Sequence, residues 1–117
     1  MLTVIRDEGK YLSKLINSIL NQKTKPMLWL IVNDGSTDIT EKILSKIRVK
    51  WIYIINIRKN TSPSLLRYSK LIRRNAKLLH ALADKKKIKW EAIAILDGDA
   101  IPEEKYFYKL LKEIKLK

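Results

Sequence analysis

Two short clusters of acids stand out because each directly follows an apolar run of the chain. The first is the turn Asn33-Asp34-Gly35-Ser36-Thr37-Asp38, and the second is Asp97-Gly98-Asp99. Carboxylate oxygens are the ligands that hard divalent cations prefer, and a carboxylate also accepts hydrogen bonds from a nucleobase. If both apolar runs are neighbouring parallel strands, the acids meet at the edge where open α/β sheets bind ligands. This placement predicts a site for a metal ion and a nucleotide.

The positive charge is distributed unevenly along the chain. The segment from Lys46 to Lys89 contains fourteen Lys or Arg and one acid, Asp84, so it carries the whole net charge of +13. In such a basic chain, carboxylates gathered at one edge indicate a bound cation that itself faces phosphate. A basic middle segment also suits nucleic acid or an anionic membrane surface, and net charge does not choose among these partners.

The composition is that of one small globular domain. The chain has 117 residues, of which 46% are hydrophobic and 32% charged, enough for a single core. Because cysteine is absent, disulfides, thiolate metal sites and cysteine nucleophiles are excluded. No apolar run approaches the ~20 residues of a spanning helix, and the start lacks the layout of a signal peptide. We therefore expect a cytoplasmic protein.

The elements that must position the acids follow from two alternating periods. Apolar runs of strand length cover residues 1–5, 27–32, 51–55 and 90–96. The helices between them are predicted to face the core through Leu12, Leu15, Ile16, Ile19, Leu20, Ile39, Ile43, Leu44, Ile47, Leu65, Ile72, Ala76, Leu79 and Ala83. This alternation predicts an α/β fold with a mainly parallel sheet of about four strands and helices on both faces.

The ends of the helices carry their own signals. Asp38 is expected to cap the second helix, with Glu41 three residues on as its capping-box partner. Pro102 is expected in the first turn of a last helix. The loop from Asn60 to Ser64 separates the third strand from a long basic helix, and Lys85-Lys86-Lys87 marks an exposed turn after it.

Several segments together resemble one known family. They are Arg6–Leu12, Ser18–Gln22, Trp29–Asp38 and Ile95–Asp99, and they span nearly all of the chain. These segments are similar to the amino-terminal half of a GT-A fold glycosyltransferase of the large inverting family 2. The resemblance implies a Rossmann-like half that binds a nucleotide-diphospho-sugar, most often a UDP-sugar, and hexosyl transfer with Mn²⁺ or Mg²⁺.

The resemblance also implies roles for the acids. Asp99 would contact the metal, and Asp97 would lie near the ribose or the waters of the metal. Gly98 would leave room for the sugar or ribose. Asp34 would accept a hydrogen bond from the base, for which the imide N–H of uracil is a suitable donor. Where many relatives have a second acid, this chain has Asn33, which leaves the choice of nucleotide open.

Further nucleotide-binding candidates follow from the same resemblance. Val4, Arg6 and Glu8 lie where the first strand and loop of the family meet the base and ribose. Arg74 resembles a basic residue that reaches the nucleotide or diphosphate, because a guanidinium matches phosphate geometry. The neighbouring Arg73 is an alternative for that role.

The general base of the inverting reaction is not evident in the sequence. In the family, this base lies well beyond the Asp-x-Asp motif, and here only Glu103, Glu104 and Glu113 follow it. We therefore expect residues 1–117 to form a single donor-binding domain, truncated before the acceptor half and inactive alone. The acceptor is left open among a lipid-linked, a polysaccharide and a protein glycan.

A non-catalytic basic domain for nucleic acid or an anionic membrane surface is the alternative function. Salt dependence separates the two, because phosphate-backbone binding weakens steeply with salt and needs no divalent ion. Both functions can coexist in a transferase held at the inner face of a membrane. A sugar nucleotidyltransferase is disfavoured by the lack of a Gly-rich loop after the first strand. An exposed sheet edge would also favour a homo-oligomer.

Overall fold

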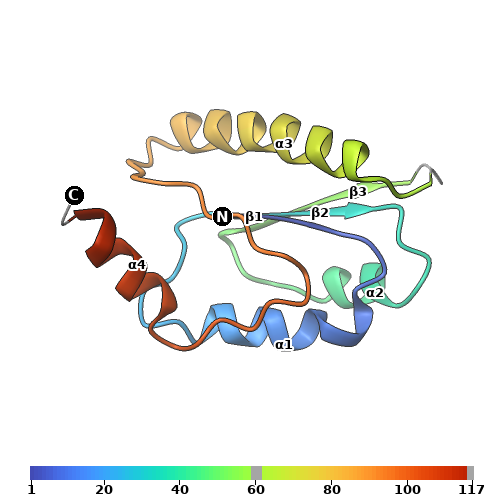
Figure 1. The fold of residues 1–117 in the computed structure, drawn as a ribbon, viewed down its shortest axis with the longest axis horizontal. Helices are drawn as coiled ribbons and strands as arrows, with labels where there is room; N and C mark the ends of the chain where they lie inside the picture. Colours follow the sequence, from blue (N-terminus) through green and yellow to red (C-terminus); the bar gives the residue numbers. More distant parts are fainter. Residues whose placement is uncertain (59–61, 116–117) are drawn as a thin grey trace.

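The computed structural model of the protein describes residues 1–58 and 62–115 and has an α/β architecture (Figure 1). Its elements are β1 (Leu2–Ile5), α1 (Gly9–Leu20), β2 (Trp29–Asp34), α2 (Thr40–Ser45), β3 (Ile52–Ile57), α3 (Leu65–Lys85) and α4 (Tyr106–Lys115). α3 covers one face of the sheet, while α1 and α2 lie on the other (Figure 1). The predicted fold class is confirmed.

The strands pair in the order β1-β2-β3, and all pairs are parallel. Residues 90–96, expected as a fourth strand, form a single parallel bridge between Leu2 and Ile95. Two hydrogen bonds hold this bridge, from Leu2 N to Ala94 O at 2.9 Å and from Leu96 N to Leu2 O at 3.1 Å. Ile95 is 49% exposed, so little packing supports a longer ladder there. β1 therefore lies between β2 and the bridged segment.

The central strand β2 is buried along its whole length, as its continuous apolar run predicts. Trp29 is completely buried, and its indole N–H donates to the Thr3 hydroxyl at 3.0 Å. One cluster packs between the sheet and α1 and includes Leu12, Leu15, Ile19, Trp29 and Ile31. A second packs between the sheet and α3 and includes Leu2, Val4, Leu30, Val32, Leu71 and Leu79. The core thus has two layers, and the strands are fixed from both sides.

Three apolar residues expected in the core are exposed instead. Leu65 is 81% exposed because it begins α3 beyond the edge of the sheet. Ile39 is 58% exposed because it precedes α2 and lies outside its buried face. Trp90 is 40% exposed and contacts the ring of His80 edge-on, with centroids 4.8 Å apart. Local periodicity predicts which face of a helix a residue lies on. The position of the helix relative to the sheet decides whether that face is covered.

The last helix begins later than expected. α4 starts at Tyr106, four residues after Pro102. The intervening residues are tied to the buried Gln22, whose side-chain N–H donates to Glu103 O at 2.6 Å. The other end of the same amide accepts from Phe107 N at 3.3 Å. One buried glutamine thus joins the end of α1 to the start of α4.

Candidate functional site

The acids predicted from the sequence meet at the carboxyl edge of the sheet. Asp34 is the last residue of β2, Glu8 follows β1, and Asp97 follows the segment bridged to β1. Because β1 lies between its two neighbours, its end separates the two acid clusters. The prediction that these acids converge on one edge is therefore met by the topology.

Asp34 forms a paired and nearly buried centre. Its side chain is 9% exposed, and Arg67 Nε donates to its two carboxylate oxygens at 3.1 and 3.0 Å. A second nitrogen of Arg67, Nη2, also bonds to Oδ1, and Arg6 Nη1 lies 3.9 Å from Oδ2. The hydrogen bonds to Asp34 raise the pKa of Arg67 and outweigh desolvation, which lowers it. The charge of Asp34 is therefore compensated within the protein.

Asp97 and Gly98 are held by their neighbours. The Tyr68 hydroxyl donates to Asp97 Oδ1 at 3.1 Å, and burial, followed by this bond, raises the pKa of Tyr68. Gly98 is buried, and a Cβ there would lie 2.6 Å from Ile5 Cγ2 and 2.8 Å from Glu8 Cγ. The close approach that requires a glycine is therefore made by the protein itself, whereas the sequence suggested a sugar or ribose.

Glu8 lies among other carboxylates. Burial raises its pKa most, and the charges of Asp99, Asp38, Asp97 and Asp7 raise it further. Like charges this close disfavour ionisation, and a cation between them would relieve the repulsion. Within residues 1–58 and 62–115, no three metal-ligating side chains form a ready cage. The acids fit a cation held by one or two carboxylates and completed by water and phosphate.

Hydrogen bonds join the loop after β1 to the turn after β2. Asp7 has a positive φ of 52°, and its carboxylate accepts from Thr37 N at 2.7 Å and Asp38 N at 3.3 Å. In return, Asp7 N donates to the Ser36 hydroxyl at 3.0 Å. A non-glycine residue with positive φ is uncommon, and here three hydrogen bonds between the loops hold it.

Asp38 joins the starts of two helices. Its carboxylate accepts from Gly9 N at 3.0 Å and from Thr40 N at 2.9 Å. Burial would raise its pKa, but the hydrogen bonds from Thr40 and Gly9 outweigh burial and lower it. The predicted cap of α2 is wrong, because Ile39 occupies the N-cap position without a side-chain cap hydrogen bond and Asp38 precedes it. The expected capping-box partner, Glu41, pairs with Arg58 at 2.6 Å.

The sequence profile of glycosyl transferase family 2 matches residues 2–116. The chain belongs to this family. No curated protein sequence matches the chain significantly. Family 2 membership agrees with the site geometry, in which acids follow parallel strands at one edge of the sheet.

Solved structures of S. aureus TarS share the fold of this family 2 chain. The TarS structure matches with a TM-score of 0.66 and 22% identity, covering 98% of this chain and 19% of TarS. TarS 1–349 in complex with UDP-GlcNAc matches with a TM-score of 0.67 and 22% identity, over 98% and 30% of the two chains. TarS 1–349 in complex with UDP matches with a TM-score of 0.65 and 23% identity, covering 98% of this chain and 32% of that one. The family 2 chain thus spans at most about a third of these proteins.

The structure places Arg67 beside Asp34, a contact that was not predicted from the sequence. Arg74 and Arg73 are exposed on α3, and Arg67 lies two turns nearer the carboxyl edge. A sequence signal for Arg67 existed but was missed. Ser64 caps α3 by accepting from Arg67 N at 3.0 Å, which places Arg67 in the first turn.

The side chains of β1 and of Arg6, which follows it, lie in different surroundings. Val4 is 7% exposed and packs in the core beneath α3, so its backbone is the part nearest the edge. Thr3 is completely buried beside Trp29. Arg6 extends from the end of β1 toward Asp34. Of these predicted nucleotide contacts, only Arg6 has its side chain at the acidic edge.

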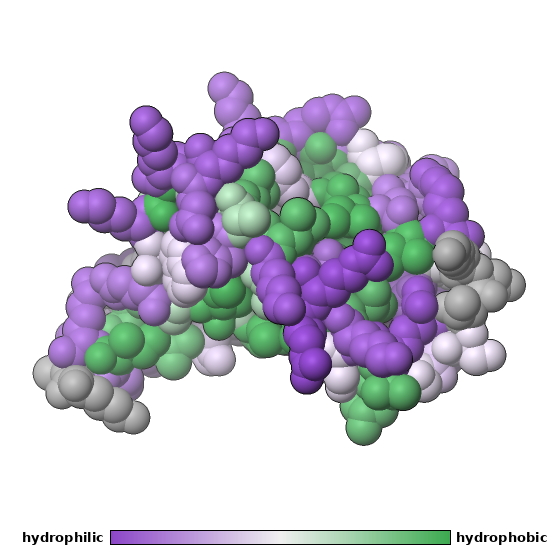
Figure 2. Space-filling view, turned by 90° about the horizontal axis from the view of Figure 1, so that it is seen from above, coloured by the Kyte–Doolittle hydropathy of each residue, from purple (hydrophilic) through white to green (hydrophobic). Residues whose placement is uncertain are grey.

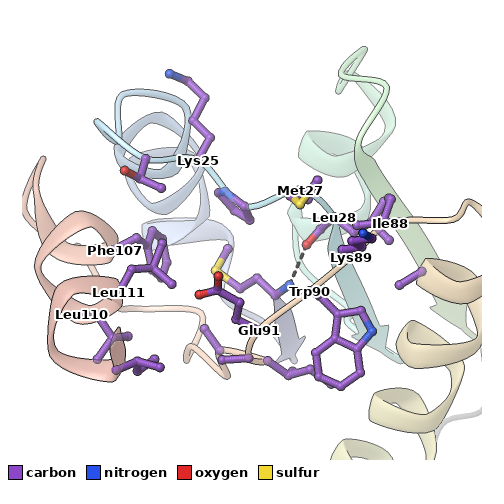
Figure 3. A pocket seen from close by; sticks show the side chains of 18 of the residues that line it. Lys25, Met27, Leu28, Ile88, Lys89, Trp90, Glu91, Phe107, Leu110 and Leu111 are labelled. Atoms are coloured by element: carbon purple, nitrogen blue, oxygen red, sulfur yellow. Dashed lines mark hydrogen bonds between the residues drawn. The ribbon is translucent and has the colours of Figure 1, made fainter. Parts of the chain in front are cut away.

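Two cavities differ in position and character. A polar one of about 210 Å³ lies beside Asp34 and is lined by Asn33, Gly35, Ser36, Thr37, Glu41, Ile57 and Arg58. An apolar one of about 450 Å³ lies at the opposite edge of the sheet, where Leu28, Trp90, Phe107, Leu110 and Leu111 surround it (Figure 3). The larger cavity contains none of the clustered acids, so cavity size does not locate the site.

Proposed function

We propose that this chain binds a UDP-sugar and a divalent cation at the carboxyl edge of its sheet, as the donor-binding part of an inverting hexosyltransferase. The observation that carries the proposal is the pair of acid centres on either side of the end of β1, Asp34 and Asp97 with Asp99. The TarS structures in complex with UDP-GlcNAc and UDP support a nucleotide-sugar ligand for this fold.

Asp34 is the proposed contact for the base. A carboxylate only accepts hydrogen bonds, so it pairs with the imide N–H of uracil. Arg67 fixes the orientation of the carboxylate through a two-nitrogen fork. Because this ion pair compensates the charge of Asp34, a neutral base can approach without an unpaired buried charge.

Asp99 and Asp97 are the proposed ligands of Mn²⁺ or Mg²⁺. Both are exposed, and Glu8 beside them is disfavoured in its charged form by burial and by their charges. The bound cation would act as a Lewis acid that stabilises the departing diphosphate. Tyr68 holds Asp97 toward α3 and leaves Asp99 as the first candidate for the cation.

Transfer to an acceptor is not expected from the described residues alone. The acids after the motif, Glu103, Glu104 and Glu113, are exposed near or on α4, and Glu103 pairs with Lys109 at 2.9 Å. A general base must lie within hydrogen-bond reach of the acceptor hydroxyl. We therefore propose that these residues bind the donor with little turnover. The acceptor, a lipid-linked, polysaccharide or protein glycan, would need a general base that these residues do not supply.

Calorimetric titration with UDP, with and without Mn²⁺, tests this proposal. We expect binding that needs the cation and is lost in Asp99→Ala, because the diphosphate then has no metal bridge to the protein. The matched control is Asp84→Ala, which removes an exposed acid from the far end of α3. UDP binding that ignores Mn²⁺ and survives Asp99→Ala would contradict the proposed site.

A further inference from the structure

α3 forms one whole outer layer of the molecule, about 30 Å long at 1.5 Å per residue (Figure 1). Its buried side consists of Leu71, Asn75, Leu79 and Ala83. On the opposite side, Leu66, Lys70, Arg73 and Lys77 are exposed. Their spacings of four, three and four residues place them on one stripe of the helix. We name these four residues the outer stripe.

The outer stripe is strongly cationic. α3 contains one acid, Asp84, which lies near its end and contacts His80 at 3.3 Å. Arg74 adds an exposed cation beside the stripe. Within the described parts of the chain, no carboxylate lies within ion-pair distance of Lys70, Arg73, Arg74 or Lys77. These charges are therefore directed to solvent.

Leucines interrupt the cationic surface. Leu65 is 81% exposed, Leu66 is 65% exposed, and Leu78 is 46% exposed. Viewed from the α3 side, hydrophilic side chains project over the molecule with hydrophobic patches between them (Figure 2). Cations attract the headgroups of anionic lipid, and an exposed leucine beside them adds apolar area that a bilayer can bury.

In residues 1–58 and 62–115, no helix combines the length and the hydropathy that a membrane crossing requires. We infer that the outer face of α3 is a docking surface for a bilayer that contains anionic lipid. The cations would meet the headgroups, while Leu66 would enter the interface.

Nucleic acid is the competing partner for a basic face. It is less favoured because exposed leucines contribute nothing to phosphate contacts, and because the outer stripe presents no aromatic ring for base stacking. A bilayer uses both features of the face, its charge and its leucines.

Docking on this face would also orient the donor site. The first turn of α3 carries the exposed Leu65 and Leu66, and the same turn carries Arg67 and Tyr68, which reach Asp34 and Asp97. The leucines therefore mark the end of α3 nearest the acids. A bilayer contacting this end would lie next to the carboxyl edge of the sheet, where an acceptor anchored in lipid could be reached.

Vesicle co-sedimentation of the whole chain without nucleotide tests the docking independently of donor binding. Vesicles of phosphatidylcholine with phosphatidylglycerol are compared with vesicles of phosphatidylcholine alone. We expect binding to the anionic vesicles only. Replacing Lys70, Arg73 and Lys77 together with Gln should weaken binding about a hundredfold, since each cation near the surface contributes about fivefold.

Two further variants distinguish binding through the outer face of α3 from binding through the net positive charge of the protein. The control replaces Lys10, Lys14 and Lys42, which are exposed on the opposite helical layer, with Gln and removes the same charge. We expect its affinity to stay within about threefold of the wild type, because these lysines face away from the docked bilayer. Leu66→Ser should weaken vesicle binding several-fold without any change in charge.

Three outcomes would overturn the inference. Equal losses in the two triple variants would assign binding to net charge and not to α3. Unchanged vesicle binding in Leu66→Ser would remove the leucines from the interaction. Tighter binding to single-stranded RNA than to the anionic vesicles at the same salt, with Leu66→Ser unaffected, would make nucleic acid the partner. UDP titration of Leu66→Ser should be unchanged, so failure here leaves the donor site untouched.

Discussion

The candidate site has two halves, one at Asp34 and one at Asp97 and Asp99, and they differ in whether the negative charge is compensated. Asp34 is nearly buried and receives hydrogen bonds from two nitrogens of Arg67. Asp97 and Asp99 are exposed, and Asp97 accepts a hydrogen bond from the neutral Tyr68 hydroxyl. Glu8, between the halves, is disfavoured in its charged form by burial and by the neighbouring acids. One half is neutral as it stands, and the other has unbalanced charge.

This difference indicates what each half can bind. A compensated carboxylate suits an uncharged ligand group, because no new charge has to be brought into the site. An uncompensated cluster favours a cation, whose arrival removes repulsion that is already present. The comparison therefore supports the proposal that the base binds at the Asp34 half and the metal at the Asp97 and Asp99 half.

The largest effect on stability is expected when the ion pair of the Asp34 half is removed. Asp34→Ala leaves Arg67 without its partner near a buried strand end, and we expect a loss of about 3 kcal/mol in the free energy of unfolding. Asp99→Ala should change it by no more than about 0.5 kcal/mol, because an exposed acid among like charges is removed. Urea denaturation of both variants without divalent ions measures this. Equal losses would refute the contrast between the halves.

A steric change at the metal half should rank second. In Gly98→Ala, the new methyl group would meet Ile5 Cγ2 at 2.6 Å, so the loop must move away from β1. We expect a loss of about 1–3 kcal/mol in the free energy of unfolding and weaker Mn²⁺-dependent UDP binding. Thermal melting and calorimetry together measure this. The control Ser13→Ala, on the exposed face of α1, should match the wild type.

The stability at acid pH should reveal the contribution of Asp38, which links the turn after β2 to the start of α1. Its pKa is lowered in the folded state, so its contribution is present above the ordinary value of 3.8 and is lost as pH falls through the folded pKa. We expect Asp38→Asn to be less stable at neutral pH and to approach the wild type in acid. Melting temperatures of Asp38→Asn and the wild type from neutral to acid pH measure the effect. If the two curves of melting temperature against pH run parallel, the prediction is wrong.

The smallest expected effect concerns Tyr68. Tyr68→Phe keeps the ring but removes the hydrogen bond to Asp97, which should lower the free energy of unfolding by about 1 kcal/mol or less. Because Asp97 is then free to turn toward a cation, we expect Mn²⁺ alone to bind slightly more tightly. Proton relaxation of water in Mn²⁺ titrations detects this, with Tyr106→Phe on α4 as the control.

The sequence predicted elements better than the contacts between them. Alternating periods gave the α/β class and placed Asp34 at the end of a strand, because these depend on local patterns and on the rules of parallel sheets. Arg67 was missed since its role depends on how α3 crosses the sheet. The same cause explains Leu65, whose apolar spacing is correct although its position lies beyond the covered face.

The bridge between Leu2 and Ile95 has a consequence for the order of folding. β1, β2 and β3 pair with neighbours that are close along the chain, whereas this bridge joins the second residue to the ninety-fifth. Closing so long a loop is slow relative to the nearer pairings. The three-stranded sheet can therefore assemble first, and Asp97 and Asp99 reach their places late. In pulse-labelling hydrogen exchange during refolding, the amides of residues 94–98 should become protected after those of β2.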